Sequence, residues 1–185
     1  MNEAAEAPRT HRGVRVGAVL TVAVAIGVIA WLLLKDGDDS PEQAGSGPSA
    51  ASLEDLRALT NSVGHPVYWA GSRAGSRYEL TQTAGGNIYI RYLPLTAALG
   101  APRPDYLTVG TYPFRRAVPT LRRLARRQRA VSARLEGGGF AVASGPRARN
   151  AYLAYPGADV QVEVFHPTPG RALQLARSGR IAPLG

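Results

Sequence analysis

The organisation of the chain follows from residues 16–34, which read VGAVLTVAVAIGVIAWLLL. This stretch carries no charge, and its apolar side chains would cover every face of a helix. At the helical rise of about 1.5 Å per residue it would span roughly 28 Å, close to the ~30 Å hydrocarbon core of a bilayer. The stretch therefore predicts a single transmembrane helix. The role of every other segment depends on the side of the membrane on which that segment lies.

The charges on either side of this stretch predict its orientation. Arg9, Arg12 and Arg15 precede it, whereas Lys35 and several acidic residues follow it. By the positive-inside rule, residues 1–15 form a cytoplasmic tail and the C-terminal part lies outside the cytoplasm, anchored in the cell membrane. A cleaved signal peptide is the alternative, but its apolar core is usually about 7–15 residues long and ends in a small-residue cleavage site. The sequence here ends in WLLLK, so we favour an uncleaved anchor.

Two further segments follow the predicted anchor. Residues 35–51 are rich in Gly, Ser, Pro and acid and poor in large apolar residues, which predicts a flexible linker. Residues 52–185 are enough for one domain with its own core. The chain has no cysteine, which excludes disulfides, thiolate metal sites and cysteine nucleophiles.

The patterning of residues 52–185 predicts an α+β domain of mostly antiparallel sheet, with about six to eight strands and about three helices. Ser52 is a candidate N-cap for the first helix, and Gly64 and Pro66 end it. The clearest hairpin pairs residues 78–83 with residues 88–93. The other predicted strands cover residues 67–70, 106–112, 140–144, 150–155, 159–165 and 180–184, and the other helices cover residues 119–135 and 169–178.

Two stretches, residues 53–94 and 121–167, resemble each other. Each reads as a helix, a short strand, a basic loop, a tyrosine-bearing strand, a glycine turn and an alternating strand that ends in proline. In this alignment residues 88–92 match residues 160–164. A duplicated α-β-β-β unit is one explanation, and the alternative is that any two hairpins share this pattern.

The charge of the chain favours anionic partners. The formal net charge is +9, and 21 of the 22 basic residues are arginine. Such a surface attracts anionic lipid, an acidic envelope polymer or an acidic protein. Nucleic acid is disfavoured because a domain outside the cytoplasm rarely meets it and the sequence has no nucleic-acid-binding motif. The alternative is that the basic residues only keep the domain soluble.

Arginines are most concentrated in the predicted helix 119–135, which would expose them on its outer side. Their planar guanidinium groups pair bidentately with phosphate and carboxylate, which predicts an anion- or partner-binding surface. A solvated surface helix without a partner is the simpler interpretation. The candidate residues are Arg122, Arg123, Arg126, Arg127 and Arg129.

A second candidate surface is the face of the sheet that points away from the helices. If the helices covered one side only, the other side would have to be polar or be covered by something else, and we expect an open polar face. Strand alternation would bring Tyr89 and Arg91 to this face, together with Gln161 and Glu163. Tyrosine and arginine are enriched in binding surfaces, although an ordinary half-wet sheet has the same pattern.

No motif of catalysis, metal binding or cofactor binding is present, and we expect no cofactor. The only histidines are His11, His65 and His166. For His65 and His166 a structural role is the simpler interpretation. An envelope hydrolase that pairs one of these two with Asp105 or Glu79 is the alternative. A structural subunit of a larger membrane assembly is a third hypothesis.

The overall pattern is typical of small single-pass envelope proteins of bacteria, which is a type of protein rather than a family. The leading expectation is therefore a membrane-anchored extracytoplasmic interaction module without catalytic activity.

Overall fold

A computed structural model describes residues 46–185 except residues 104 and 128. The predicted cytoplasmic tail, the predicted transmembrane helix 16–34 and residues 35–45 of the predicted linker lie outside these residues. No helix within residues 46–185 is long and apolar enough to cross a membrane.

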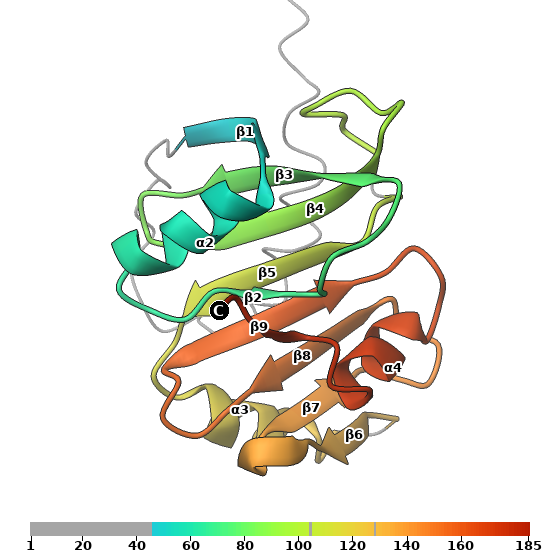
Figure 1. The fold of residues 1–185 in the computed structure, drawn as a ribbon. Helices are drawn as coiled ribbons and strands as arrows, with labels where there is room; N and C mark the ends of the chain where they lie inside the picture. Colours follow the sequence, from blue (N-terminus) through green and yellow to red (C-terminus); the bar gives the residue numbers. More distant parts are fainter. Residues whose placement is uncertain (1–45, 104, 128) are drawn as a thin grey trace, which may run out of the picture. The chain divides into compact units, whose positions relative to one another are not determined.

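The described chain forms an eight-stranded sheet in which every neighbouring pair of strands is antiparallel, which confirms the predicted α+β domain (Figure 1). The strand order is β1-β3-β4-β5-β9-β8-β7-β6. The strands are β1 (Ser46–Ala51), β3 (Ser76–Gln82), β4 (Ile88–Pro94), β5 (Thr108–Pro113), β6 (Val131–Arg134), β7 (Phe140–Ala143), β8 (Asn150–Ala154) and β9 (Val160–Phe165). A second sheet pairs β2 (Tyr68–Trp69) with β10 (Ala182–Pro183).

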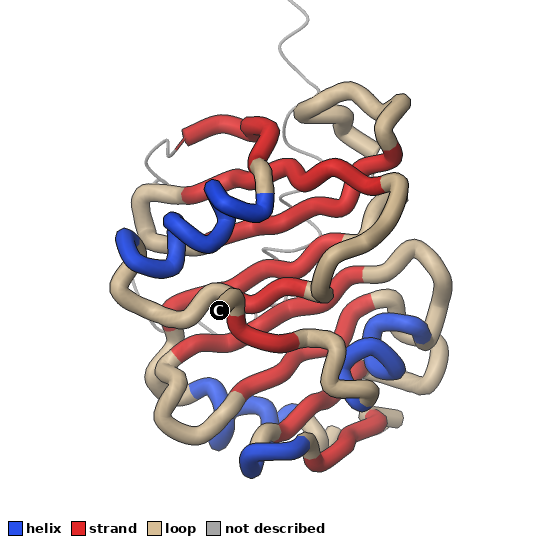
Figure 2. The backbone as a smooth tube through the Cα atoms, viewed as in Figure 1, coloured by secondary structure: helices blue, strands red, loops and turns tan. Residues whose placement is uncertain are grey.

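The main core lies on one face of the large sheet, which we call the core face. Ile88 and Ile90 of β4, Val109 of β5 and the valines of β9 point into this core and are fully buried or nearly so. Helices α2 (Leu53–Ser62) and α4 (Arg171–Arg177) and the small β2–β10 sheet cover it. Figures 1 and 2 show these elements in front of the large sheet.

Helix α2 begins where the sequence predicts. The Ser52 hydroxyl accepts a hydrogen bond from the Asp55 backbone N–H, and the Asp55 carboxylate accepts one from the Ser52 N–H. This capping box satisfies two N–H groups that the first turn of a helix leaves without an intrahelical partner. Leu56 and Leu59 then turn toward the core, which attaches the helix to the sheet.

The folded part begins earlier than the sequence predicts. Residues 46–51 were expected to belong to the flexible linker, but they form the edge strand β1, which pairs with β3. Five of its six residues are exposed, and its composition has little strand propensity. Pairing with β3, rather than local preference, therefore makes this segment a strand.

The arginine-rich helix is shorter than predicted. Helix α3 spans Ala117–Leu124 rather than residues 119–135, and the residues at its far end form strand β6. Between them the backbone makes turns closed by hydrogen bonds between residues three apart, and Arg129 adopts a left-handed conformation with φ 68°. Arginines three or four residues apart would repel one another on a longer helix. The hydrogen bonds between β6 and β7 stabilise the extended conformation instead.

Helix α3 also changes the expected layering. It contacts β7, β8 and β9, as α4 does, but Figure 1 shows it behind the sheet whereas α4 lies in front. Its buried residues Ala117 and Leu121 are not part of the main core. The helices therefore cover both faces of the sheet rather than one.

The two stretches that resemble each other take different positions in the sheet. β4, which contains residues 88–92, lies between β3 and β5, whereas β9, which contains residues 160–164, pairs with β5 at the centre. The sheet itself suggests another correspondence: β3–β5 and β7–β9 are each a three-strand meander followed by a helix. The α-β-β-β duplication stays a prediction.

Candidate functional site

Strand register brings the four predicted sheet residues together on the face opposite the core. Tyr89 lies across from Gly110, which lies across from Glu163, and Tyr112 lies across from Gln161. Arg91 follows Tyr89 by two residues and shares its face. We call this the polar face, and its residues include Glu79, Tyr89, Arg91, Thr108, Tyr112, Asn150, Tyr152, Gln161 and Glu163.

The polar face is covered at these positions rather than open as expected. Gln161 is 8% exposed, Glu163 is 3% exposed and the Arg91 side chain is 12% exposed. Helix α3 covers the strands at one end of the sheet, and the loop between β4 and β5 covers part of the other end. The buried carboxylates of this face therefore need partners within the protein.

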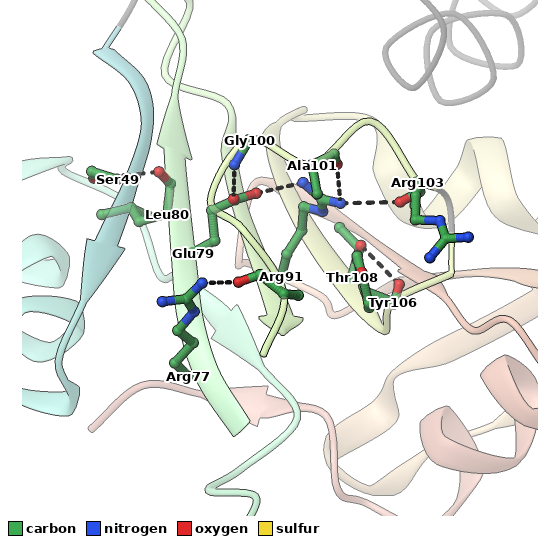
Figure 3. A network of polar contacts seen from close by, with 11 residues as sticks. Ser49, Arg77, Glu79, Leu80, Arg91, Gly100, Ala101, Arg103, Tyr106 and Thr108 are labelled. Carbon is green, nitrogen blue, oxygen red and sulfur yellow. Dashed lines mark hydrogen bonds and ion pairs between the residues drawn. The ribbon is translucent and has the colours of Figure 1, made fainter. Parts of the chain in front are cut away.

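The first carboxylate, Glu79, is paired with Arg91 (Figure 3). Arg91 Nη1 donates to Glu79 Oε1 at 2.5 Å, and neither side chain is substantially exposed. The other Glu79 oxygen accepts a hydrogen bond from the Gly100 backbone N–H at 2.5 Å. A buried ion pair tolerates its loss of solvent only with such additional hydrogen bonds.

Arg91 also ties the β4–β5 loop to the sheet. Its Nη2 donates to the carbonyl oxygens of Ala101 at 2.9 Å and Arg103 at 3.1 Å, and its guanidinium lies 5.4 Å from the ring centre of Tyr106. Arg77 of β3 adds a hydrogen bond to the carbonyl oxygen of Ala97 (Figure 3). The loop backbone is thus attached to β3 and β4 at several points.

The second carboxylate, Glu163, has only neutral partners among the described residues. The Tyr112 hydroxyl donates to Oε2 at 2.8 Å, and the Tyr152 hydroxyl donates to Oε1 at 3.2 Å. The Asn150 amide donates to the same Oε1. Neighbouring strands β5, β8 and β9 supply this cluster, which therefore couples the two halves of the sheet.

Burial controls protonation in the Glu163 cluster. It raises the pKa of Glu163 above its ordinary value, and the three hydrogen bonds oppose that shift without cancelling it. Burial and the neighbouring Glu163 charge raise the pKa of both Tyr112 and Tyr152. Both hydroxyls consequently stay protonated and remain hydrogen-bond donors at neutral pH.

Gly110 makes room for this arrangement. A Cβ atom at residue 110 would lie 2.6 Å from the Tyr112 hydroxyl oxygen, so any side chain there would displace the tyrosine. The sequence prediction missed Tyr112, Tyr152 and Asn150 as partners of Glu163. The period-two alternation could have placed the tyrosines on one face, but the choice of neighbouring strands was not readable from the pattern.

The histidines do not form an acid–base pair with a carboxylate within the described residues. His65 contacts the carbonyl oxygens of Pro66 at 3.1 Å and Gly86 at 3.0 Å. His166 Nδ1 accepts a hydrogen bond from the Thr168 N–H at 3.0 Å. Burial lowers the pKa of His166, and the charges of Arg73 and Arg171 act in the same direction.

The predicted arginines are exposed, but only two of them lie on a helix. Arg122 and Arg123 are in the last turn of α3, where the helix dipole stabilises positive charge. Arg126, Arg127 and Arg129 follow the helix. The wider segment 115–134 contains eight exposed arginines and no acid. None of these arginines belongs to either of the ion pairs found in the described part of the chain, Arg91–Glu79 and Arg103–Asp105.

The described residues include no group of three or more His, Asp or Glu side chains placed to hold a metal ion. Comparison with protein-family models, with curated proteins and with solved structures found no match to this chain.

The two buried glutamates predict opposite responses to amidation. Burial raises the folded-state pKa of Glu163 above its ordinary value of 4.5. The protonated carboxyl therefore stabilises the wild-type fold fully below about pH 4.5, and this stability is lost as pH rises through the raised pKa. The Glu163→Gln variant has no group that titrates at this position. The free energy of unfolding of the variant, relative to the wild type, should therefore increase with pH above 4.5. Chemical denaturation at a series of pH values measures this difference.

Glu79→Gln is the matched control, since it makes the same chemical change on the same face. It leaves the Arg91 charge buried without its partner, and we expect a loss of about 3–5 kcal/mol in the free energy of unfolding at pH 7. A pH-independent difference between Glu163→Gln and wild type would contradict this account of the Glu163 cluster.

Proposed function

We propose that this chain is a single-pass membrane protein whose domain lies outside the cytoplasm and binds a polyanionic partner through the arginine-rich segment 115–134. The observation that carries the proposal is the set of eight exposed arginines without an acidic residue in the segment. In this proposal residues 16–34 are the anchor and the domain has a binding role rather than a catalytic one.

The distribution of acids supports a basic exterior. Two of the seven acidic residues from residue 53 onward, Glu79 and Glu163, are buried and bonded inside the polar face. Glu54 and Asp55 lie at the N-terminus of α2, and Asp105 is paired with Arg103. Few carboxylates are therefore left to neutralise the arginines of segment 115–134.

The chemistry of arginine supports an anionic partner of repeating charge. Each exposed guanidinium can form a charge-assisted, bidentate pair with a phosphate or carboxylate, and several such pairs add together on a flexible polyanion. A single exposed pair contributes little in water, so binding should depend on the number of arginines and on salt. Anionic lipid, an acidic polymer and an acidic protein all present this chemistry.

Charge reversal tests the arginine-rich segment. We expect Arg126→Glu combined with Arg127→Glu to weaken binding of the full-length, detergent-solubilised protein to immobilised polyphosphate and polyglutamate by at least about tenfold, roughly 1.4 kcal/mol. The salt dependence of binding should also become shallower, because fewer ionic contacts are formed.

A matched control separates local from overall charge. Arg177→Glu combined with Arg180→Glu changes the net charge by the same amount at two exposed residues at and beyond the end of α4. We expect less than about a twofold effect from it, because it leaves segment 115–134 intact. An equal loss of binding affinity in the two double variants would contradict the proposal of a local binding surface.

The orientation is tested by reporters fused after Gly185. Three arginines before residues 16–34 against one lysine immediately after them should export the domain. A reporter enzyme that is active only outside the cytoplasm should therefore be active, and a reporter that folds only in the cytoplasm should be silent. The reverse pattern would place the domain in the cytoplasm and overturn the proposed choice of partners.

A further inference from the structure

The loop between β4 and β5 carries an apolar, exposed tip. Residues 94–102 read PLTAALGAP and contain no charged side chain. Leu95 is 68% exposed and Leu99 is 39% exposed, and they are the exposed large hydrophobic residues of the described chain. Single exposed leucines are common, but two of them on one uncharged loop form a surface that a partner could cover.

The loop tip is attached to the sheet by buried polar groups. Glu79 accepts from the Gly100 N–H, Arg91 donates to the Ala101 carbonyl, and Arg77 donates to the Ala97 carbonyl (Figure 3). Backbone bonds from Ala97 to Pro94 and from Ala101 to Ala98 add two turns. The polar backbone is thus satisfied from beneath while the leucine side chains stay outside.

This tip lies beside the strand through which the chain enters the domain. A Cβ atom at Gly100 would lie 4.0 Å from Cγ of Pro48 in β1. Figure 1 shows β1 and the loop at the same end of the sheet. The loop is therefore near the first residues of the domain rather than at its far end.

The strand β1 also shortens the link to the apolar stretch 16–34. Only residues 35–45 separate that stretch from Ser46. As a flexible coil these residues would span about 18 Å on average, and fully extended they would reach at most about 40 Å. If residues 16–34 are the proposed anchor, a link of this length would keep the adjoining part of the domain close to the membrane.

We propose that the loop tip Leu95–Leu99 docks onto the bilayer that holds the chain's own anchor, with both leucines inserted at the level of the lipid headgroups. The inference rests on the proposed single-pass anchor. The tether supplies a high effective concentration, so a small apolar contact is sufficient for docking. Docking would orient the domain on the membrane rather than leave it to rotate freely.

Site-specific labels in the full-length protein test this orientation. The chain contains no cysteine, so Leu95→Cys, Leu99→Cys and the control Ser144→Cys can each carry one fluorophore. Ser144 is exposed after β7, near the opposite edge of the sheet from β1. Residue 144 lies close to the arginine-rich segment, since a Cβ atom at Gly145 would be 3.8 Å from the Arg129 carbonyl oxygen. The labelled proteins are therefore reconstituted in nanodiscs of zwitterionic phosphatidylcholine, which offer that segment no anionic lipid, and quenching by headgroup-proximal spin-labelled lipid is compared with quenching by iodide in water.

The docked state predicts that labels at residues 95 and 99 are quenched by the lipid probe and at least about threefold less by iodide than the label at residue 144. Labels that all respond to iodide alike, in protein that co-elutes with the discs, would overturn docking and leave the anchor standing. Labels at 95 and 99 that are shielded from iodide but not quenched by lipid would indicate a protein partner or a second copy instead, which also overturns it. Protein that does not co-elute with the discs would refute the anchor together with this inference.

Discussion

The buried ion pair between Glu79 and Arg91 is the interaction on which one half of the polar face depends. It joins the neighbouring strands β3 and β4. The second carboxylate oxygen of Glu79 and the second guanidinium nitrogen of Arg91 bind the backbone of the β4–β5 loop. A charge in this position cannot be left unpaired without a large loss of stability. The ion pair therefore fixes the loop at Gly100, Ala101 and Arg103, and Arg77 adds a contact at Ala97.

The protein treats its other buried carboxylate differently. Glu163 lies at the centre of the sheet, where neutral tyrosine and asparagine donors bind its carboxyl oxygens and no cation pairs with it within the described residues. At 3% exposure it is a hydrogen-bonding centre of the fold. The two buried carboxylates are thus internal, whereas the arginines of segment 115–134 and the apolar loop tip are exposed. This division supports the proposed binding role.

Local patterns in the sequence predicted much of the fold. The capping box at Ser52, the hairpin of β3 and β4 and the shared face of Arg91 and Glu163 all follow from spacing and periodicity. Strand β1 was not predictable because its residues prefer irregular structure and become a strand only by pairing with β3. The end of α3 was missed because residues 125–130 contain no glycine or proline to mark it. The partners of Glu163 depend on strand order, which no local pattern contains.

The central claim, that the Glu79–Arg91 pair fixes the β4–β5 loop, is tested most directly by hydrogen exchange at the Gly100 amide in the full-length protein. The account predicts that this amide exchanges at least about a hundredfold more slowly than in an unstructured peptide, because its N–H is bonded to a buried carboxylate. In Glu79→Gln the protection should fall while the amides of the β8–β9 ladder stay protected. Exchange of Gly100 at the unstructured rate in the wild-type protein, or unchanged protection in Glu79→Gln, would contradict the claim.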